Sequence, residues 1–350
     1  MTQREVFPDP TVVMIGAGAM GGVIAGALAQ AGAALSIIDT DADHAAAINA
    51  DGLRVAGLGV DTALSVATST QPPEAGYADL AVIMTPAYAT QAAADTARTI
   101  LKPDGAAVSM QNGLGNQEVL VDTLGADRVF MGSTKVSADR PAPGCPRATR
   151  IDPSTVGEID GRPRERTLWL ADTLSRGGLP TEASENITGV LWSKFIHNCG
   201  INALSAITGL RMGEVTRTPG LGDLRWQIIE EALTVARAKR IRLADPDPIP
   251  RLKAHVWRKF TKPSMLQHVE QGRPIEIDAI NGWLVREADA LGLDVPANRM
   301  VTALARGRAL AATRALHETP DYAALSADAE AEIARGETPW DRAAQQGDER

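Results

Sequence analysis

The sequence predicts an α/β protein in which a parallel-sheet domain of the Rossmann type precedes an all-helical domain. In the first half, short β-branched apolar runs alternate with helical stretches, which is typical of a parallel sheet covered by helices on both faces. After residue 180 the strand signal fades, and from residue 186 the periodicity is helical. The 350 residues also exceed one ordinary core. We therefore expect a cofactor-binding domain over 1–183, a helical substrate and dimerisation domain over 184–318, and a polar extension over 319–350.

The elements are expected in the following order along the chain. Buried strands are predicted at 11–15, 34–38, 80–84, 106–110 and 129–131, with more sheet at 149–159. The helices between them are predicted at 21–31, 87–101 and 116–124, and the Pro/Gly-rich stretch 140–146 is expected to be a loop. In the second half, helices are predicted at 187–205, 221–243 and 277–291, with one more at 323–334 in the extension.

The composition argues against several classes of function. A formal charge of -8 disfavours a nucleic-acid partner, because phosphate contacts need a basic surface. Cys145 and Cys199 are too few for a disulfide framework, and no ligand spacing indicates a metal site. No apolar run reaches membrane-spanning length, and the N-terminus does not resemble a signal peptide. We expect a cytoplasmic protein that binds a small molecule.

A glycine motif follows the first predicted strand and opens the first predicted helix. In Gly16-Ala17-Gly18-Ala19-Met20-Gly21, Gly16 permits a tight turn and Gly18 lets the backbone approach a pyrophosphate. Gly21 allows close packing of helix on strand. Because the context is right on both sides, the motif predicts dinucleotide binding at the helix N-terminus.

An acidic residue, Asp39, ends the second predicted strand, where a carboxylate accepts hydrogen bonds from the adenosine ribose. A 2′-phosphate there would also meet Asp41 and Asp43, with no neighbouring Arg or Lys in the sequence. This favours NAD(H), with NADP(H) as the alternative cofactor. The alternative for Asp39 itself is that it only caps the next helix.

Three polar residues, Lys194, Asn198 and Asn202, fall four residues apart in an apolar segment. On one helix each step of four turns the direction by only about 40°, so they share a stripe. Burying a cation and two amides is costly unless something polar lies opposite, and a substrate is one such partner. The alternative is that the stripe caps a neighbouring element or faces water.

Three further blocks, taken with the glycine motif, resemble the 2-dehydropantoate 2-reductase (ketopantoate reductase) family over about residues 11–310. The blocks are the QNGLGN segment at 111–116, the helix that carries Lys194, and the pair SMLQ at 264–267 with EIDAING at 276–282. The resemblance implies that Lys194 is the general acid that protonates a carbonyl oxygen as hydride reaches its carbon. Asn112 is implied to hold the nicotinamide side and touch the substrate, and Glu276 to bind the nicotinamide ribose and help place Lys194.

The remaining implied contacts form two sets. The substrate's carboxylate and hydroxyl are implied to be held by Asn198, Asn202 and Ser264. The cofactor-binding set is implied to include Gly16, Gly18, Ala19, Met20, Gly21, Asp39, Asn112, Ala138 and Glu276. Taken alone, Glu276 would be a solvated carboxylate at a helix start and Ser264 an N-cap.

Elementary chemistry agrees with the role implied for Lys194. Hydride transfer to a ketone builds negative charge on oxygen, which an ammonium stabilises before it supplies the proton. Burial lowers the pKa of a lysine toward working pH, and Glu276 would oppose that shift.

Four departures from the family pattern bear on cofactor and substrate. Pro86 replaces a lysine that commonly contacts the phosphate end of the cofactor, which again favours NAD(H). His268 stands where aspartate is usual, and Met212 where some members place a substrate-binding asparagine. A thioether cannot hydrogen-bond a hydroxyl as an amide does. The fourth departure is a polar extension beyond about residue 315, which either covers a neighbouring subunit or is disordered.

The leading hypothesis is reduction of a 2-oxo acid, ketopantoate first, to the D-2-hydroxy acid. The alternative is an NAD-dependent D-2-hydroxy acid dehydrogenase of the same superfamily that acts on another 2-oxo acid. A more distant alternative is a non-catalytic nucleotide-sensing protein, which would not need the set around Lys194. We find no motif for the amine site of an opine-forming enzyme. A homodimer is expected from the resemblance.

Overall fold

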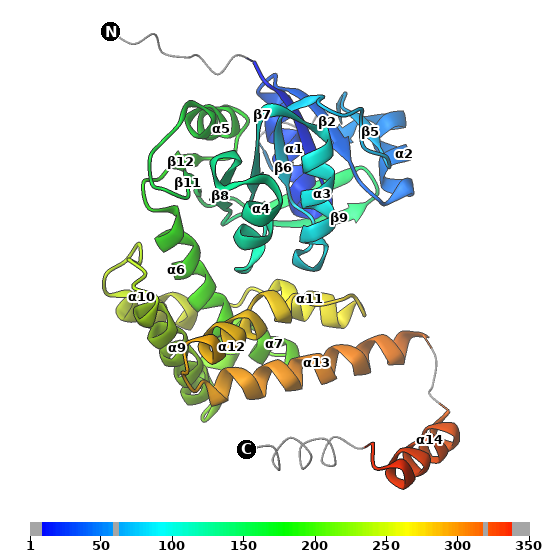
Figure 1. The fold of residues 1–350 in the computed structure, drawn as a ribbon, viewed down its shortest axis with the longest axis vertical. Helices are drawn as coiled ribbons and strands as arrows, with labels where there is room; N and C mark the ends of the chain where they lie inside the picture. The colour runs from blue at the N-terminus through cyan, green and yellow to red at the C-terminus, as the bar shows by residue number, and fades with distance from the viewer. Residues whose placement is uncertain (1–8, 59–62, 318–320, 338–350) are drawn as a thin grey trace.

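The computed structural model describes residues 9–58, 63–317 and 321–337. Figure 1 shows two bodies, a sheet domain and a helical domain, with one helix running from the first into the second. The sheet has eight strands in the order β12-β11-β8-β7-β6-β1-β2-β5. Their bounds are β1 (Thr11–Ile15), β2 (Ala34–Ile38), β5 (Ala67–Ser69), β6 (Ala78–Ile83), β7 (Leu101–Ser109), β8 (Val129–Ser133), β11 (Ser154–Glu158) and β12 (Thr181–Ala183). All neighbouring pairs are parallel except β11 with β8.

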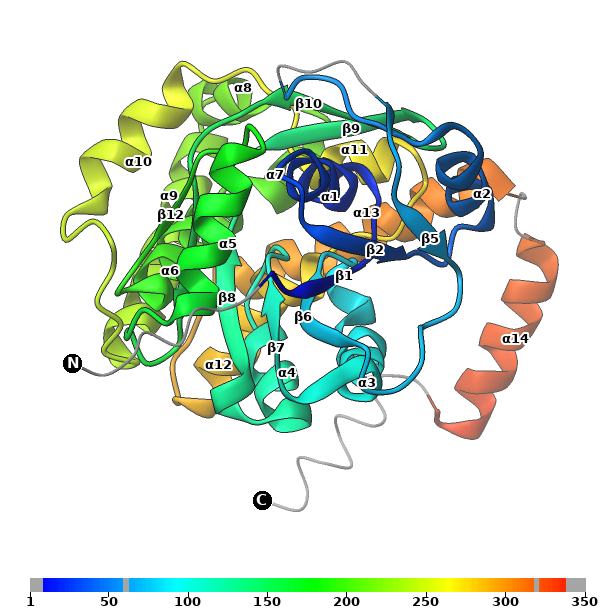
Figure 2. The ribbon, with the colours of Figure 1, turned by 90° about the horizontal axis from the view of Figure 1, so that it is seen from above.

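Helices cover both faces of this sheet, as the alternating pattern predicted. On one face lie α1 (Ala19–Gln30) and α5 (Glu165–Arg176), and on the other α3 (Thr90–Ile100) and α4 (Asn116–Leu124), as Figure 2 shows from above. Each face has its own apolar core. The helix α2 (Ala42–Asp51) packs near the edge strand β5.

The register brings several loops to one edge of the sheet. Ile15 pairs with both Ile38 and Ile83, and Ser109 pairs with both Ile83 and Met131. The carboxyl ends of β1, β2, β6, β7 and β8 therefore lie side by side. The glycine motif, Asp39, the segment after β6 and the segment after β7 all follow these ends, which is where ligands bind in open α/β sheets.

The stretch 140–146, expected to be a loop, is part of a β-hairpin. Strand β9 (Ser137–Ala142) pairs antiparallel with β10 (Cys145–Arg150), and Gly144 turns the chain between them with a φ of +71°. Pro141 and Pro146 are tolerated because this two-stranded ribbon consists of edge strands only. The hairpin lies over α1, as Figure 2 shows.

The second half is helical throughout the described residues and has its own core. Its helices are α6 (Ile187–Cys199), α7 (Asn202–Thr208), α8 (Met212–Arg217), α9 (Leu221–Ala238), α10 (Pro248–Trp257), α11 (Ser264–Glu270), η3 (Ile277–Ala279), α12 (Asn281–Ala290) and α13 (Pro296–His317). No described helix combines the length and apolar character that a membrane crossing requires. The predicted helix in the extension is confirmed as α14 (Tyr322–Arg335), which stands apart from both bodies in Figure 1 and has no buried residue.

The predicted helix over 187–205 is wrong as a single element, because the structure breaks it into α6 and α7 at Gly200 and Ile201. Gly200 packs so closely on Ile229 of α9 that an added Cβ would lie 2.7 Å from it. The side chain of Asn281, which is fully buried, donates to the carbonyl of Cys199 at 3.1 Å. A carbonyl released by the break is thereby satisfied.

Candidate active site

The glycine motif forms a tight loop between β1 and α1. Gly16 has a φ of +88°, which favours glycine, and a Cβ on Gly21 would lie 2.0 Å from the carbonyl oxygen of Gly16. A Cβ on Gly18 would meet no described atom within 4 Å. The start of α1 has no side-chain cap and no acidic residue in its first turn. The loop thus combines a packed underside with an open upper side where helix N–H groups can receive an anion.

Asp39 contacts this loop directly. Its Oδ2 accepts from the N–H of Ala17 at 2.7 Å and its Oδ1 from the N–H of Asp41 at 2.9 Å. The cap of α2 is instead Asp41, whose Oδ1 accepts from the N–H of His44 at 3.0 Å. Asp39 is therefore not a helix cap, and its carboxylate lies beside the glycine loop.

The expectation that no basic residue lies near Asp39, Asp41 and Asp43 is wrong. Strand β9 brings Arg140 to Asp41, with Nη2 2.8 Å from Oδ2. The sequence could not reveal this pair because the hairpin folds back from 99 residues away. The pKa of Asp41 is lowered, first by the His44 backbone N–H and then by Arg140. Ala138, on the same strand, is half-buried.

His44 connects three segments around the glycine loop. Its ring is fully buried, with Nε2 2.8 Å from the carbonyl of Ala17. The N–H of Gly144, at the hairpin turn, donates to Nδ1 at 2.8 Å. Because Nδ1 accepts, Nε2 must carry the proton, and the neutral ring holds α2, the loop and the hairpin together. Nothing in the sequence around His44 predicts these contacts.

The segment after β7 is held by a buried polar network. Gln111 donates to the carbonyl of Thr85 at 2.8 Å and to the hydroxyl of Thr90 at 3.0 Å, and that hydroxyl donates to Asn116 at 2.8 Å. Asn116 in turn donates to the carbonyl of Asn112 at 3.0 Å. The Asn112 side chain makes no hydrogen bond with the described residues, so the network positions it and leaves it available.

Lys194 extends from α6 to the edge of the sheet. Its Nζ donates to the carbonyl of Thr134, just after β8, at 2.7 Å, and the residue is half-buried. Burial lowers the pKa of Lys194 to about 8, the Glu276 carboxylate opposes that shift, and Lys135 adds to it. The ammonium has a neutral carbonyl as its partner, so its charge is only partly compensated.

Glu276 links the two domains. Its Oε1 accepts from the N–H of Ala87, the residue after Pro86, at 2.9 Å. Ala87 is the first residue of the 3-10 helix η1 (Ala87–Ala89), so its N–H has no partner within that helix. Nearby, the N–H of Leu114 donates to the carbonyl of Ala279 at 3.1 Å. Glu276 therefore acts on Lys194 through its charge and lies against the segment after β6.

The side chains of Asn198, Asn202 and Ser264 make no hydrogen bond with any described residue. Asn198 is half-buried on α6, Asn202 opens α7 with 5 % of its surface exposed, and Ser264 opens α11 and is exposed. The N-cap of α11 is Pro263, so Ser264 does not serve as the cap. An amide as buried as Asn202 is costly without a partner, which indicates that a ligand or water meets it.

His268 and Met212, two of the departures, have neighbours within the helical domain. The Nδ1 of His268 lies 2.9 Å from the carbonyl of Pro274, and the N–H of Arg273 donates to the carbonyl of His268. Burial lowers the pKa of His268, so the neutral ring braces the turn that leads to Glu276. The sulfur of Met212 accepts a weak hydrogen bond from Thr261 at 3.5 Å.

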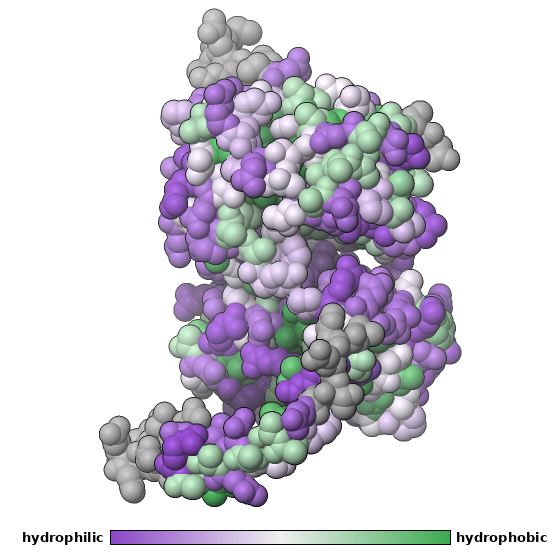
Figure 3. Space-filling model, turned by 90° about the vertical axis from the view of Figure 1, so that its right-hand side faces the viewer, coloured by the Kyte–Doolittle hydropathy of each residue, from purple (hydrophilic) through white to green (hydrophobic). Residues whose placement is uncertain are grey.

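Two contacts join the domains at this edge of the sheet: Lys194 donates to the Thr134 carbonyl, and Glu276 accepts from the Ala87 N–H. Figure 3 shows the surface hollowed along the junction of the two domains. The candidate residues of the sheet domain are the glycine loop, Asp39 and Asn112, and those of the helical domain are Lys194, Asn198, Asn202, Ser264 and Glu276. Among the described residues no group of three His, Cys, Asp or Glu side chains could hold a metal. The arrangement suits polar chemistry between a nucleotide and a small anionic molecule.

Comparison with known proteins identifies relatives over both domains. Residues 12–161 match the family described as ketopantoate reductase PanE/ApbA, and residues 186–309 match its C-terminal domain. The 2-dehydropantoate 2-reductase of Pyrococcus horikoshii is 30 % identical over 298 residues, covering 85 % of this chain and 97 % of that protein. The enzyme of the same name from Mesorhizobium japonicum is 30 % identical over 329 residues, covering 87 % and 98 %.

Solved structures with the same architecture include a PanE/ApbA family ketopantoate reductase from Ralstonia eutropha. That structure is 33 % identical, has a TM-score of 0.79, and covers 86 % of this chain and 99 % of its own. A D-mandelate dehydrogenase solved with NADH and anilino(oxo)acetate has a TM-score of 0.78 at 24 % identity, with 86 % and 99 % covered. At that identity the likeness establishes a shared fold only.

Proposed function

The chain belongs to the ketopantoate reductase family, and from this premise we propose that it reduces ketopantoate to pantoate with a reduced nicotinamide cofactor. The cofactor, when bound, supplies the hydride. The glycine loop fits such a group, because Gly18 is open above and Gly16 and Gly21 are closely packed below. Gly16, Gly18, Ala19, Met20, Gly21, Asp39, Asn112, Ala138 and Glu276 are the residues we propose to hold it.

The observation that carries the proposal is the Lys194 ammonium at the carboxyl edge of the sheet, with a pKa of about 8. At pH 7 such a group is about 90 % protonated, so the acid is charged before the reaction starts. Its charge stabilises the developing alkoxide, and its lowered pKa makes the proton easier to give. The Glu276 carboxylate keeps the pKa of Lys194 from falling further, so Lys194 stays protonated at neutral pH.

The substrate's carboxylate and hydroxyl are proposed to bind Asn198, Asn202 and Ser264. Two amides and a hydroxyl without protein partners offer several donors to a carboxylate. A bound 2-oxo acid would compensate the burial of Asn202 and would add a negative charge near Lys194.

We propose NAD(H) over NADP(H) because Asp39 lies against the loop, where it would repel a 2′-phosphate and accept from ribose hydroxyls. Arg140 would have to leave Asp41 before it could pair with a 2′-phosphate. Steady-state rates with NADH and NADPH decide the point, and a higher kcat/KM with NADPH would reject the preference.

The proposed reaction is tested by following cofactor oxidation with ketopantoate, pyruvate, 2-oxoisovalerate and phenylglyoxylate. A kcat/KM for ketopantoate well above the others is expected. Met212, in place of an asparagine that could bind the substrate's hydroxyl, is the observation that keeps a second candidate, an NAD-dependent D-2-hydroxy acid dehydrogenase. A preference for the simpler 2-oxo acids would select that candidate, and no turnover of any of the four would refute both.

We further propose that the protein forms a homodimer. The faces available for it include α14, whose Tyr322, Leu325 and Ile333 are 65 %, 45 % and 61 % exposed. These three positions lie within about 80° of one another around the helix, so they form one apolar stripe.

A further inference from the structure

A second hollow opens between the domains, and the residues assigned above do not line it. It has a volume of about 490 Å³ and is lined by Arg150, Arg251, Ala254, Arg258 and Lys259. Four of the five lining residues are cations and none is acidic. Arg150 ends β10 of the sheet domain, and the others belong to α10 or the two residues after it.

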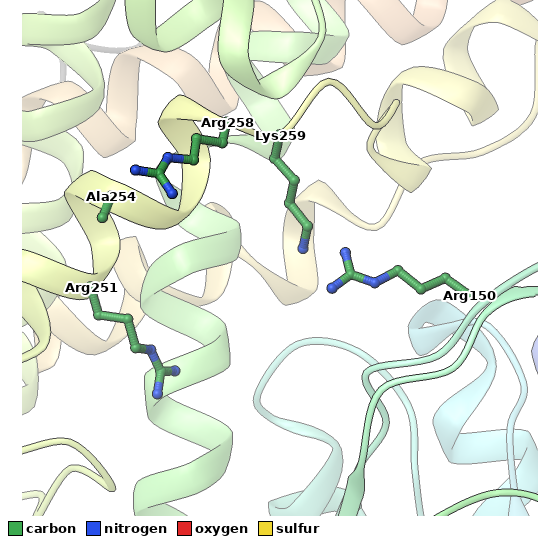
Figure 4. Close-up of a pocket in the computed structure, with 5 residues that line it drawn as sticks. All are labelled: Arg150, Arg251, Ala254, Arg258 and Lys259. Carbon is green, nitrogen blue, oxygen red and sulfur yellow. The ribbon is translucent and has the colours of Figure 1, made fainter.

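Two of these cations face each other across the domain junction. Figure 4 shows the side chains of Lys259 and Arg150 extending toward one another from opposite domains. Burial lowers the pKa of Lys259, the Arg150 guanidinium lowers it further, and Asp152 opposes both. Asp152 already pairs with Arg150, with Nη2 2.7 Å from Oδ2. The Asp152 carboxylate offsets part of the repulsion between these two cations, and an oxyanion bound between them would offset more of it.

The other two cations reinforce the positive potential. Within the described part of the chain, neither Arg251 nor Arg258 takes part in an ion pair, and both are exposed. In a protein with a formal charge of -8, four cations around one hollow stand out against the surrounding surface. Guanidinium groups bind phosphate and carboxylate through paired N–H donors.

The hollow connects to the residues proposed for catalysis through short stretches of chain. Ser154, four residues after Arg150, has its hydroxyl 3.4 Å from that of Thr134, whose carbonyl accepts from Lys194. On the other side, Lys259 lies five residues before Ser264. An anion held here would thus contact both domains, on segments of chain that continue to the residues of the proposed reaction.

We infer that this hollow binds a phosphate or carboxylate group that bridges the two domains. The shared chemistry is an oxyanion held by guanidinium groups, and it has two sources: a free phosphate-bearing molecule, or a second anionic group on the substrate. In the second case the inference rests on the proposed function. The binding itself does not depend on it.

The test measures the melting temperature with pyrophosphate against potassium chloride of the same ionic strength, with saturating NADH present throughout so that the glycine loop is already occupied. We expect pyrophosphate at about ten times its Kd to raise the Tm by roughly 2–4 °C. In the Arg251→Gln/Arg258→Gln double variant the rise should fall below about 1 °C. Arg308→Gln, which removes one exposed charge from α13, is the control and should behave like the wild type.

Two results would overturn the inference: a rise no larger than in potassium chloride, or the same rise in the double variant. If the double variant fails to fold, Arg251→Gln alone replaces it, with a weaker but still measurable loss. Because this readout needs no turnover, binding without reduction of any 2-oxo acid would overturn the proposed function and leave the anion site standing.

Kinetics with 2-oxoadipate and 2-oxohexanoate, which differ by a terminal carboxylate, identify the source. A substrate-borne anion predicts that the wild type prefers 2-oxoadipate and that the double variant loses about tenfold of this preference. If the site binds a free anion, the wild type should show no such preference. Pyrophosphate should then change the KM for 2-oxohexanoate in the wild type but not in the double variant. Pyrophosphate that bound without either effect would overturn the placement of the site beside the reacting groups.

Discussion

Lys194 is governed by three opposing influences. Burial lowers its pKa, Glu276 raises it, and Lys135 lowers it again. Its hydrogen bond goes to the neutral carbonyl of Thr134 and not to a carboxylate. A direct ion pair would hold the proton more tightly, whereas this arrangement leaves an ammonium that can both stabilise charge and release a proton.

The first prediction concerns removal of that ammonium. In Lys194→Ala, kcat should fall by about 10³ or more, because both the charge and the proton donor are lost. Cofactor affinity, measured by quenching of protein fluorescence, should change little. Lys194→Arg is the matched control: it keeps a charge but donates its proton poorly, so its kcat should stay low. A near-normal kcat in the alanine variant would contradict the assignment.

The second prediction is the pH dependence of the reduction. The reaction needs the ammonium, so kcat should be flat below the pKa and fall as pH rises through about 8. Glu276→Gln removes a charge that raises this pKa, so the fall should move to lower pH. Lys135→Gln removes a charge that lowers it, so the fall should move to higher pH. If both variants kept the wild-type profile, Lys194 would not be the titrating group.

At the level of single residues, the sequence revealed side chains that are unusual for their surroundings, such as the charged Lys194 in an apolar helix. It did not reveal their partners. The Thr134 carbonyl is 60 residues from Lys194, and a backbone carbonyl carries no sequence signal. Gln111 was noted as part of the QNGLGN segment but given no role, and His44 was missed, because their contacts with Thr85, Thr90 and Gly144 arise only in the fold.

Among the elements, the glycine loop permits a test that separates binding from stability. Gly18→Val should abolish detectable cofactor binding while the Tm stays within about 2 °C of the wild type, since its Cβ meets no described atom. Gly21→Val should lower the Tm sharply, since its Cβ would lie 2.0 Å from the Gly16 carbonyl. Calorimetry and NADH titration of both variants check this. Unchanged NADH affinity in Gly18→Val would refute the placement of the pyrophosphate.

Elements were predictable where one periodicity ran without interruption. The five strands predicted in the first half are all present, because short buried apolar runs between helical stretches are strong signals. Those at 11–15 and 34–38 are also ended directly by Gly16 and Asp39. The break between α6 and α7 was not predictable, since helical periodicity continues through Gly200 and the compensating Asn281 lies 82 residues away. The hairpin of β9 and β10 was missed because Pro and Gly indicate a turn but not the strands beside it.

At the scale of the whole molecule, the segment around η3 sets how the domains meet. Glu276 accepts from Ala87, and the carbonyl of Ala279 accepts from Leu114, so two successive sheet loops rest on one short stretch. The same stretch carries the charge that tunes Lys194. Glu276 therefore couples the arrangement of the domains to the pKa of Lys194, and we expect a substitution of Glu276 to alter both.

The last prediction is that the full chain self-associates. Light scattering coupled to size exclusion should give about 74 kDa, twice the 36.9 kDa of one chain. Tyr322, Leu325 and Ile333 form an apolar stripe that nothing in the described monomer covers, and burying it against a second copy would remove it from water. Leu325→Glu/Ile333→Glu should shift the mass toward the monomer at low micromolar concentration. Asp328→Lys, a charge change on the same helix outside the stripe, should not. A monomeric wild type would reject the homodimer. If the double variant is still a dimer, the interface lies elsewhere, and the exposed Met300 and Leu304 of α13 are the next residues to substitute.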